Sequence, residues 1–289
     1  MVPWEGVSSL APDPVEKKPL YHFLPGAKTL SFGTLGCNFS CSYCQNYSIS
    51  VPQDNSIWRE FSALELAELA VKENVRVMVA TYNEPTVSLE WALEIFKKGR
   101  QLLPDMKVGL VSNGYLSIEA IELLSGIDFI KIDLKSFDRN KFAELTGASL
   151  QGVLDCIKDT VKRGFWIELV TPLVPGFNDS QKEIEEAAYF ILSIDSELPW
   201  HITAFRPAYR MRNRAASEQD VRRAVMIARS CGLKYVYGGN VFAPDLLATF
   251  CPGCGKKVLE REALLMVKNH LLPGGKCPCC SKTIRGVWE

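Results

Sequence analysis

Three cysteines fall within eight residues of this chain, at Cys37, Cys41 and Cys44. The C-x3-C-x2-C spacing allows three thiolates to converge on one inorganic centre from a single loop, and Gly36 suits a tightly folded backbone there. A [4Fe–4S] cluster usually has four cysteine ligands, so three thiolates without an obvious fourth would leave one iron open. The alternatives are a fragment of a metal knuckle, which normally pairs C-x2-C units, and a chance group of buried cysteines. We predict an iron–sulfur cluster on this loop.

This stretch resembles the radical S-adenosylmethionine (SAM) superfamily, in its cysteine spacing and in the aromatic Tyr43 before the third cysteine. The resemblance implies that the thiolates hold three irons, that SAM chelates the fourth, and that Tyr43 lies against the adenine. The segments Asp13–Gly26 and Cys44–Asn46 resemble the radical SAM member of the AmmeMemoRadiSam system, a group related to the activating enzymes of pyruvate formate-lyase. The likeness runs from about Asp13 to the C-terminus.

The composition is that of an ordinary soluble protein, because 289 residues with 47% hydrophobic and 23% charged side chains can bury a sizeable core. The 33 basic and 33 acidic residues balance, so no global field favours nucleic acid or a membrane. Met1–Glu5 lacks the basic start of an export signal, and no apolar run reaches the ~18 residues of a membrane span. Ten cysteines in such a chain indicate metal binding rather than disulfides, so we expect a cytoplasmic protein.

Strand and helix patterns alternate after the cysteine loop, which implies parallel strands joined by right-handed crossovers. The predicted strands are Thr29–Thr34, Val75–Ala80, Lys107–Val111, Phe129–Leu134, Trp166–Val170, His201–Phe205 and Tyr235–Tyr237. Six or seven strand–helix units fall short of the eight that close a full barrel. We predict a partial, laterally open (β/α)6 barrel, which the radical SAM resemblance also implies. The predicted divisions are an extended arm over 1–28, a radical SAM core over 29–244 and a small zinc-ribbon-like module over 245–289.

Glu84 follows the second predicted strand, at the kind of strand end where parallel α/β folds gather functional groups. By resemblance it occupies the place of the family's Gly-Gly-Glu-Pro, which binds the amino group of SAM. Tyr82 and Asn83 stand where the family has glycines. The alternative is a simple helix start over 86–100, with Glu84 near the positive end of the helix and Pro85 in its first turn.

Polar residues also follow the third and fourth predicted strands. Ser112 and Asn113 suit ribose hydroxyls, as the matching segment does in relatives, although Asn-Gly is also a common turn. Lys131, Asp133 and Lys135 alternate along one face of a strand, where charges are costly to bury unless they are paired. The alternative to function is therefore a structural ion pair. Asp133 and Lys135 resemble the Asp-x-Lys of the activating enzymes, which implies catalytic positions beside the carboxylate end of SAM.

His201, in the sixth predicted strand, is one of three histidines in the chain. A lone histidine in a strand is more often a core residue with satisfied hydrogen bonds. Relatives place a histidine near the substrate end of the barrel at a similar position, and this resemblance makes His201 a third candidate for a catalytic role.

The last forty residues carry two further C-x2-C units, and this pattern is typical of a zinc ribbon. The predicted zinc ligands are Cys251, Cys254, Cys277 and Cys280. Cys279 breaks the C-x2-C step and is left out. Four thiolates also suit an iron–sulfur cluster, so the ligand type alone leaves the metal open.

The resemblance implies an enzyme that reduces SAM at the cluster to a 5′-deoxyadenosyl radical, which removes hydrogen from a substrate. The substrate is a protein, as for the activating enzymes, or alternatively RNA or a small molecule. A different alternative is a non-catalytic iron–sulfur and zinc scaffold for partner proteins. The expected partners are SAM, an electron donor such as flavodoxin or ferredoxin, and a protein substrate or AmmeMemoRadiSam partner proteins. We expect no membrane and no nucleic-acid partner.

Overall fold

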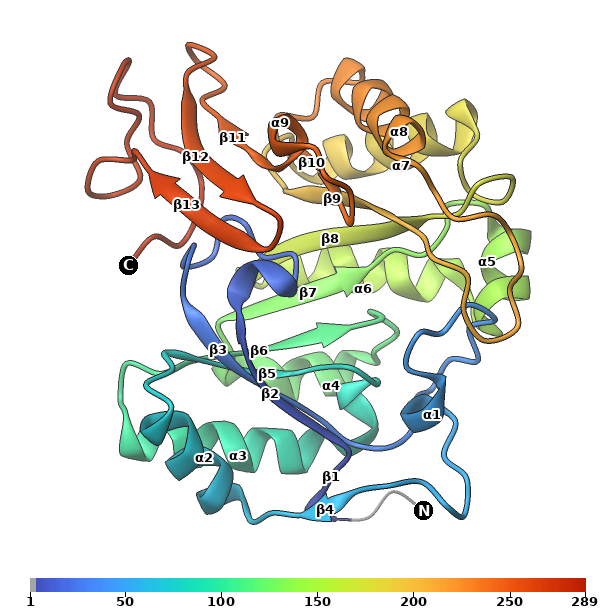
Figure 1. Cartoon of the computed structure of the whole chain (residues 1–289), viewed down its shortest axis with the longest axis vertical. Coiled ribbons are helices and arrows are strands. Elements are labelled where there is room, and N and C mark those ends of the chain that lie inside the picture. The colour runs from blue at the N-terminus through green and yellow to red at the C-terminus, as the bar shows by residue number, and fades with distance from the viewer. Residues whose placement is uncertain (1–3) are drawn as a thin grey trace.

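The structure is a computed structural model that describes residues 4–289, so residues 1–3 of the predicted arm lie outside it. An eight-stranded sheet forms its centre, with the strand order β10-β9-β8-β7-β6-β5-β3-β2 (Figure 1). The strands are β2 (Ser9–Pro14), β3 (Lys28–Gly33), β5 (Val77–Ala80), β6 (Lys107–Ser112), β7 (Phe129–Asp133), β8 (Trp166–Leu173), β9 (Trp200–Ala204) and β10 (Val236–Gly239).

The predicted alternation of strands and helices is confirmed, because β3 and β5 to β10 all pair in parallel. The connecting helices are α2 (Ala63–Lys72), α3 (Leu89–Leu102), α4 (Ile118–Leu123), α5 (Arg139–Thr146), α6 (Leu150–Lys162), α7 (Gln181–Ile194) and α8 (Glu218–Ser230). The edge strands β2 and β10 are not paired with each other, so the sheet is an open barrel of the predicted class. Short elements are β1 (Gly6–Val7), η1 (Val15–Lys17), α1 (Tyr47–Ser50), β4 (Arg59–Glu60) and η3 (Leu124–Gly126).

The arm contains a strand that its sequence did not predict. β2 runs antiparallel to β3, with Ser9 opposite Gly33 and Pro14 opposite Lys28. Proline lacks the N–H that a central strand would need, but an edge strand tolerates it because one side of the strand has no neighbour. Pro12 and Pro14 hid the strand by disturbing the expected pattern.

Helix starts follow local sequence where a cap is present. Ser62 and Glu65 form a capping box at the start of α2, with the Ser62 N–H donating to the Glu65 carboxylate at 2.8 Å. The predicted helix over 86–100 begins differently. A 3-10 turn, η2 (Pro85–Ser88), comes first, and α3 starts only at Leu89. The Glu84 carboxylate accepts the Thr86 N–H at 3.2 Å, which favours this tight turn.

The open side of the barrel is covered by the chain's own ends. The backbone N–H groups of Tyr21 and His22 each donate to Glu168 on β8 at 2.9 Å. The guanidinium of Arg261, on the tail strand β12 (Lys257–Glu262), donates to the Tyr21 carbonyl at 2.6 Å. Figure 1 shows the blue arm between the sheet and the red hairpin of β12 and β13 (Leu265–Asn269). The arm and the tail therefore fill the lateral gap between the edge strands.

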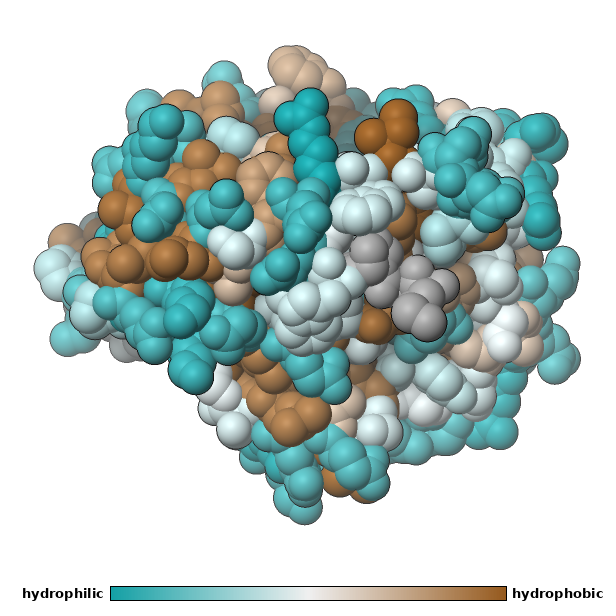
Figure 2. All heavy atoms as spheres, turned by 90° about the horizontal axis from the view of Figure 1, so that it is seen from below, coloured by the Kyte–Doolittle hydropathy of each residue, from teal (hydrophilic) through white to brown (hydrophobic). Residues whose placement is uncertain are grey.

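No helix among residues 4–289 combines the length and the apolar character needed to cross a bilayer. Figure 2 shows one face of the molecule, on which brown apolar areas are divided by teal hydrophilic side chains. The remaining tail elements are α9 (Pro244–Leu247) and β11 (Thr249–Phe250), which pairs with β12.

Candidate functional site

A cavity of about 460 Å³ lies at the carboxyl ends of the parallel strands. This volume falls within the range of roughly 300–1,000 Å³ that is usual for small-molecule sites. The cavity brings together nine predicted site residues, which are Cys37, Cys41, Tyr43, Cys44, Glu84, Ser112, Asn113, Asp133 and Lys135. His201 is the predicted residue of this group that does not line it.

Asn83 anchors the cysteine loop. Its side-chain amide donates to the Gly36 carbonyl at 2.8 Å and accepts the Thr34 N–H at 3.0 Å. Gly36 has a φ of +93°, a conformation that favours glycine. The other end of the loop is held by a hydrogen bond of 2.9 Å from the Ser40 N–H to the Thr146 carbonyl. Asn83 stands where the family has a glycine, and its amide cross-links the cysteine loop to the end of β3, a role that the motif alone did not predict.

The three loop cysteines line the cavity without gathering their sulfur atoms around one point. Their sulfur atoms do not form a group within 4.8 Å of one another, whereas the tail cysteines do, among the described residues. The irons of a four-iron cluster lie apart from one another, so the thiolates that hold them are also spread apart. Burial raises the pKa of the Cys37 thiol to about 11, so a metal centre that binds it has to displace its proton.

Glu84 is almost completely buried and ties two strand ends together. One carboxylate oxygen accepts hydrogen bonds from the hydroxyls of Thr86 and Ser112, both at 2.9 Å. The other accepts the Asn113 N–H at 2.7 Å. Burial raises the pKa of Glu84. The carboxylate is thereby held in one orientation at the cavity wall, together with the two polar residues of the neighbouring strand.

Asp133 lies between two lysines on β7. Its carboxylate contacts the ammonium of Lys131 and, at 3.1 Å, that of Lys135. Burial alone would raise the pKa of Asp133, but the two positive charges lower it to about 2. The Lys135 ammonium also lies 5.9 Å from the centre of the Tyr43 ring, so it is the lysine beside the cysteine loop. The Tyr43 hydroxyl is buried and has no hydrogen-bond partner within the described residues.

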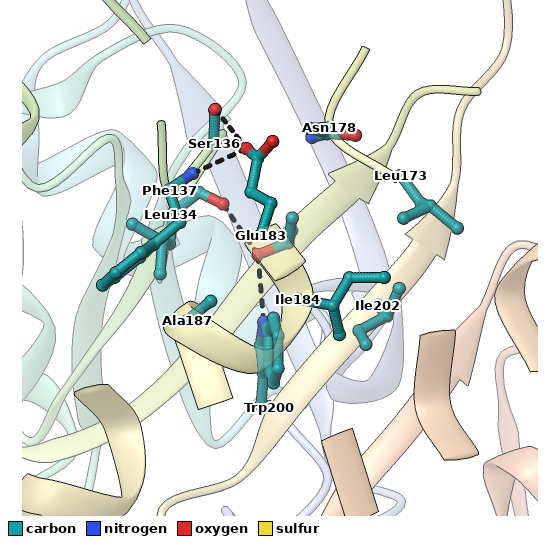
Figure 3. A pocket seen from close by; sticks show the side chains of 11 residues that line it. Leu134, Ser136, Phe137, Leu173, Asn178, Glu183, Ile184, Ala187, Trp200 and Ile202 are labelled. Atoms are coloured by element: carbon teal, nitrogen blue, oxygen red, sulfur yellow. Dashed lines mark hydrogen bonds between the residues drawn. The ribbon is translucent and has the colours of Figure 1, made fainter. Parts of the chain in front are cut away.

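The segment that carries Lys135 is held from behind by polar residues that sequence reasoning did not single out. Asn178 donates to the Lys135 carbonyl at 2.8 Å, and Glu183 accepts the Ser136 hydroxyl at 2.5 Å and the Phe137 N–H at 2.9 Å. Figure 3 shows these side chains around a second cavity of about 20 Å³, which is no larger than a water site. Their role is to support the wall of the main cavity.

His201 belongs to a buried layer beneath the cavity. Its Nε2 donates to Glu168 at 2.7 Å, because a carboxylate can only accept. Its ring stacks on Tyr237 and meets the edge of Tyr21. Burial lowers the pKa of His201. Burial alone would raise the pKa of Glu168, but the interaction with His201 outweighs it and leaves that pKa below its usual value. The position matches a core histidine with satisfied hydrogen bonds, and its catalytic role stays a prediction.

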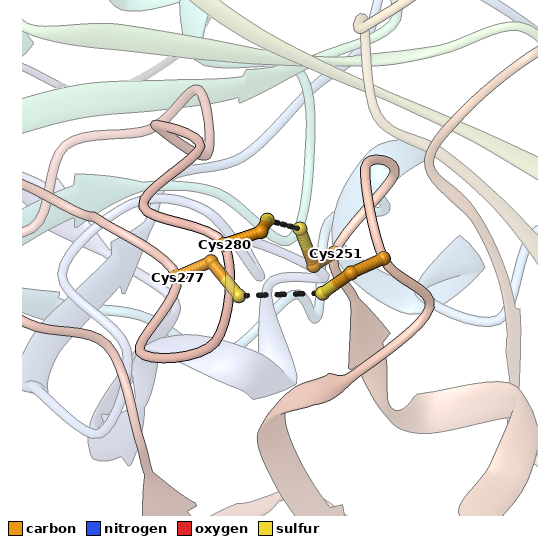
Figure 4. A group of neighbouring side chains, drawn as sticks. Cys251, Cys277 and Cys280 are labelled. Atoms are coloured by element: carbon orange, nitrogen blue, oxygen red, sulfur yellow. Dashed lines mark hydrogen bonds between the residues drawn. The ribbon is translucent and has the colours of Figure 1, made fainter.

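The four tail cysteines converge on one point. The sulfur atoms of Cys251 and Cys280 are 3.5 Å apart and those of Cys254 and Cys277 are 3.7 Å apart (Figure 4). A tetrahedral ion with metal–sulfur bonds of ~2.3 Å places its sulfurs ~3.8 Å apart. The arrangement therefore fits a single metal ion. Cys279 is exposed and lies outside the group, as the spacing predicted.

The comparisons with known proteins agree with this geometry, because residues 32–188 match the family model of the radical SAM superfamily. The chain belongs to the radical SAM superfamily. An uncharacterized protein of Methanocaldococcus jannaschii is 34% identical over 96% of this chain and 84% of its own length. A putative glycyl-radical enzyme activating enzyme of the same organism is 32% identical over 70% of this chain and 76% of its own length.

The fold also resembles that of a solved radical SAM protein. A radical SAM methyltransferase from Sphaerobacter thermophilus superposes with a TM-score of 0.59 at 16% identity, covering 75% of this chain and 68% of that one. Radical SAM proteins use a [4Fe–4S] cluster and SAM. The residues of this radical SAM chain fit both groups, since three thiols and the aromatic Tyr43 line one cavity of suitable volume.

Proposed function

We propose that this chain is a radical SAM enzyme of the activating-enzyme type and the radical SAM member of an AmmeMemoRadiSam system. The observation that carries the proposal is the convergence of Cys37, Cys41 and Cys44 with the polar strand ends on one cavity. A pure scaffold would need the thiols but would have no use for the buried carboxylate and lysine groups beside them.

Each side chain has a proposed task at that cavity. The thiolates of the loop hold three irons, and Tyr43 lies against the adenine. The Glu84 carboxylate, held by Asn113, receives the amino group of SAM, while Ser112 and Asn113 face the ribose. Asp133 and Lys135 orient the carboxylate end. When bound, the reduced cluster and SAM supply a 5′-deoxyadenosyl radical that removes hydrogen from the substrate.

The proposed electron donor is a flavodoxin or ferredoxin, and the proposed substrate is a polypeptide. The relationship to glycyl-radical activating enzymes supports a protein substrate. Because the arm and the tail cover the lateral gap, a polypeptide would enter over the carboxyl ends of the strands. The proposed tail module over 245–289 binds Zn²⁺, which has no redox chemistry and suits four thiolates at these distances.

The decisive experiment is anaerobic reconstitution of the full chain with iron and sulfide, followed by reduction in the presence of SAM. The wild-type protein is expected to bind about four irons on the loop and to release 5′-deoxyadenosine. The triple variant of Cys37, Cys41 and Cys44 to Ala loses both signals. Cys231→Ser, which changes a half-buried cysteine outside both metal groups, keeps both. Release of 5′-deoxyadenosine by the triple variant would refute the proposal.

A further inference from the structure

Positive charge is concentrated on the main cavity although the chain as a whole has zero formal net charge. Among the described residues, the acidic side chains that line the cavity are Asp133 and Glu84. The lysines that line it are Lys17, Lys18, Lys131 and Lys135. Glu84 is already committed to hydrogen bonds from neighbouring groups. The cavity therefore has more ammonium groups than carboxylates to balance them.

The lysines occur as two sets in which a pair of ammonium groups shares one carboxylate. Lys17 and Lys18 contact different oxygens of Asp13, at 2.5 and 2.9 Å. Lys131 and Lys135 share Asp133 in the same way. Each set keeps one positive charge in excess. An excess charge that is removed from water is costly unless a ligand of opposite charge arrives.

Two of the lysines that line the cavity are themselves buried. Lys18 and Lys131 are each only 5% exposed. Lys131 lies two residues before the end of β7, so it is about 7 Å below the rim. Lys131 pairs with Glu168 on the neighbouring strand. Glu168 also accepts the Tyr21 N–H, and Tyr21 comes three residues after Lys18 in the arm. The arm thus brings Lys18 to the cavity that Lys131 also lines.

Neither proposed cofactor would remove the excess charge at Lys18 and Lys131. The negative charge of the three thiolates lies beside Lys135, whose ammonium is near the Tyr43 ring. SAM has a sulfonium and an ammonium against one carboxylate, so its net charge is positive, and its carboxylate is assigned to the position of Lys135. Desolvation lowers the pKa of both Lys18 and Lys131, and each is partly restored by its aspartate. Lys18 and Lys131 each contact an aspartate, but each shares it with a second lysine, and neither the loop nor SAM brings them a further anion.

We propose that the substrate of this enzyme carries a carboxylate or phosphate group, which Lys18 and Lys131 bind in the main cavity. The proposal rests on the proposed function and adds the chemical class of the substrate. Leu264, at the turn of the β12–β13 hairpin, and Pro19 line the same cavity and offer apolar contact to the rest of the substrate. The competing explanation is that both lysines serve only as structural partners of Asp13 and Asp133.

The test measures anion binding by the cluster-loaded, SAM-bound full chain with isothermal titration calorimetry. Malonate and inorganic phosphate are the two probes, and they distinguish a carboxylate site from a phosphate site. The wild-type protein is expected to bind one of them with a dissociation constant on the order of 1 mM. Lys18→Met and Lys131→Met each weaken that binding about tenfold or more, because a charge-assisted hydrogen bond is lost. Lys182→Met, which changes an 85% exposed lysine, has no effect.

Two controls keep the outcome decisive. Lys18→Arg retains the positive charge and is expected to retain anion binding. This variant keeps the test decisive if Lys131→Met proves too unstable to purify. SAM affinity is measured in parallel, and Lys18→Met leaves it unchanged. Absence of binding for both probes, or equal binding by Lys18→Met, would overturn the anion site. Failure of SAM cleavage in the wild-type protein would instead overturn the proposed function, so the two failures are separable.

Discussion

The Glu84 carboxylate accepts the backbone N–H of Asn113 at 2.7 Å, and this contact joins the ends of two neighbouring strands through one buried side chain. The same carboxylate accepts the Thr86 N–H at 3.2 Å. Every group around it is therefore a donor or can act as one. The residue proposed to bind SAM is also the residue that keeps the cavity wall in place.

Glu84→Gln is expected to lower both stability and SAM affinity. The amide nitrogen of glutamine has to face a backbone N–H, either that of Asn113 or that of Thr86, and an unsatisfied buried donor costs about 1–3 kcal/mol. Denaturant unfolding and SAM titration measure the two effects. Glu90→Gln, at an exposed position of α3, serves as the control. A variant with wild-type SAM affinity would show that Glu84 is structural only.

Asp133→Asn is expected to destabilise the protein by about 3–5 kcal/mol at neutral pH, because two buried ammonium groups lose their carboxylate. The pKa of Asp133 is lowered from 3.8 to about 2. The ionised form of Asp133 therefore stabilises the fold by about 2 kcal/mol above about pH 4. This contribution is lost as the pH falls toward 2. Unfolding curves at pH 6 and pH 3 should show the gap between wild type and variant shrinking. A constant gap would contradict the pairing.

Exchanging the charges of Asp133 and Lys135 separates structure from function at this pair. If the two residues only pair with each other, the exchanged double variant keeps its SAM affinity along with its stability. We expect the affinity to fall far more than the melting temperature, because the ammonium beside Tyr43 is replaced by a carboxylate. SAM titration beside a melting curve measures both, and unchanged affinity would refute the orienting role.

The tail is expected to contain about one zinc per chain, in addition to the iron of the loop. Cys280→Ser loses the zinc and loosens the tail, whereas Cys279→Ser keeps it, since only Cys280 belongs to the converging group. Elemental analysis of the reconstituted protein gives the ratio. A zinc-free protein with about twice the iron would show that the tail holds a second cluster instead.

His22 makes stability fall on mild acidification. Its Nδ1 donates to the Arg285 carbonyl at 2.7 Å and its Nε2 accepts the Tyr237 hydroxyl at 2.5 Å, so the ring is neutral. Burial lowers its pKa from 6.5 to about 4. Below pH 6.5 the unfolded chain takes up the proton first, and about 3 kcal/mol is lost by pH 4. The fall in the free energy of unfolding between pH 6.5 and pH 4 is expected to be smaller in His22→Gln. His270→Gln, which changes a surface residue, is expected to show the same fall as the wild type.

The metal ligands and most of the sheet could be predicted from sequence because both depend on short spacings. Cysteines at positions 37, 41 and 44 share one loop whatever the rest of the chain does. The strand Val77–Ala80 is apolar enough to show that both of its faces are covered. The polar strand ends then meet at one edge, because parallel strands share the direction of their carboxyl ends. β2 was missed because its prolines mask the strand pattern.

The sequence by itself determined the loop thiols, the tail thiols and the parallel α/β order, since each follows from local spacing and periodicity. Only the tertiary structure decided that the two ends of the chain would cover the open side of the barrel. The contact of Arg261 with Tyr21, and of Tyr21 with Glu168, joins residues far apart in sequence. The same packing brings Lys18 to the cavity that Lys131 of β7 also lines, and it leaves His201 outside that cavity. Such contacts depend on complementary shape and on paired buried charge, which no repeat along the chain encodes.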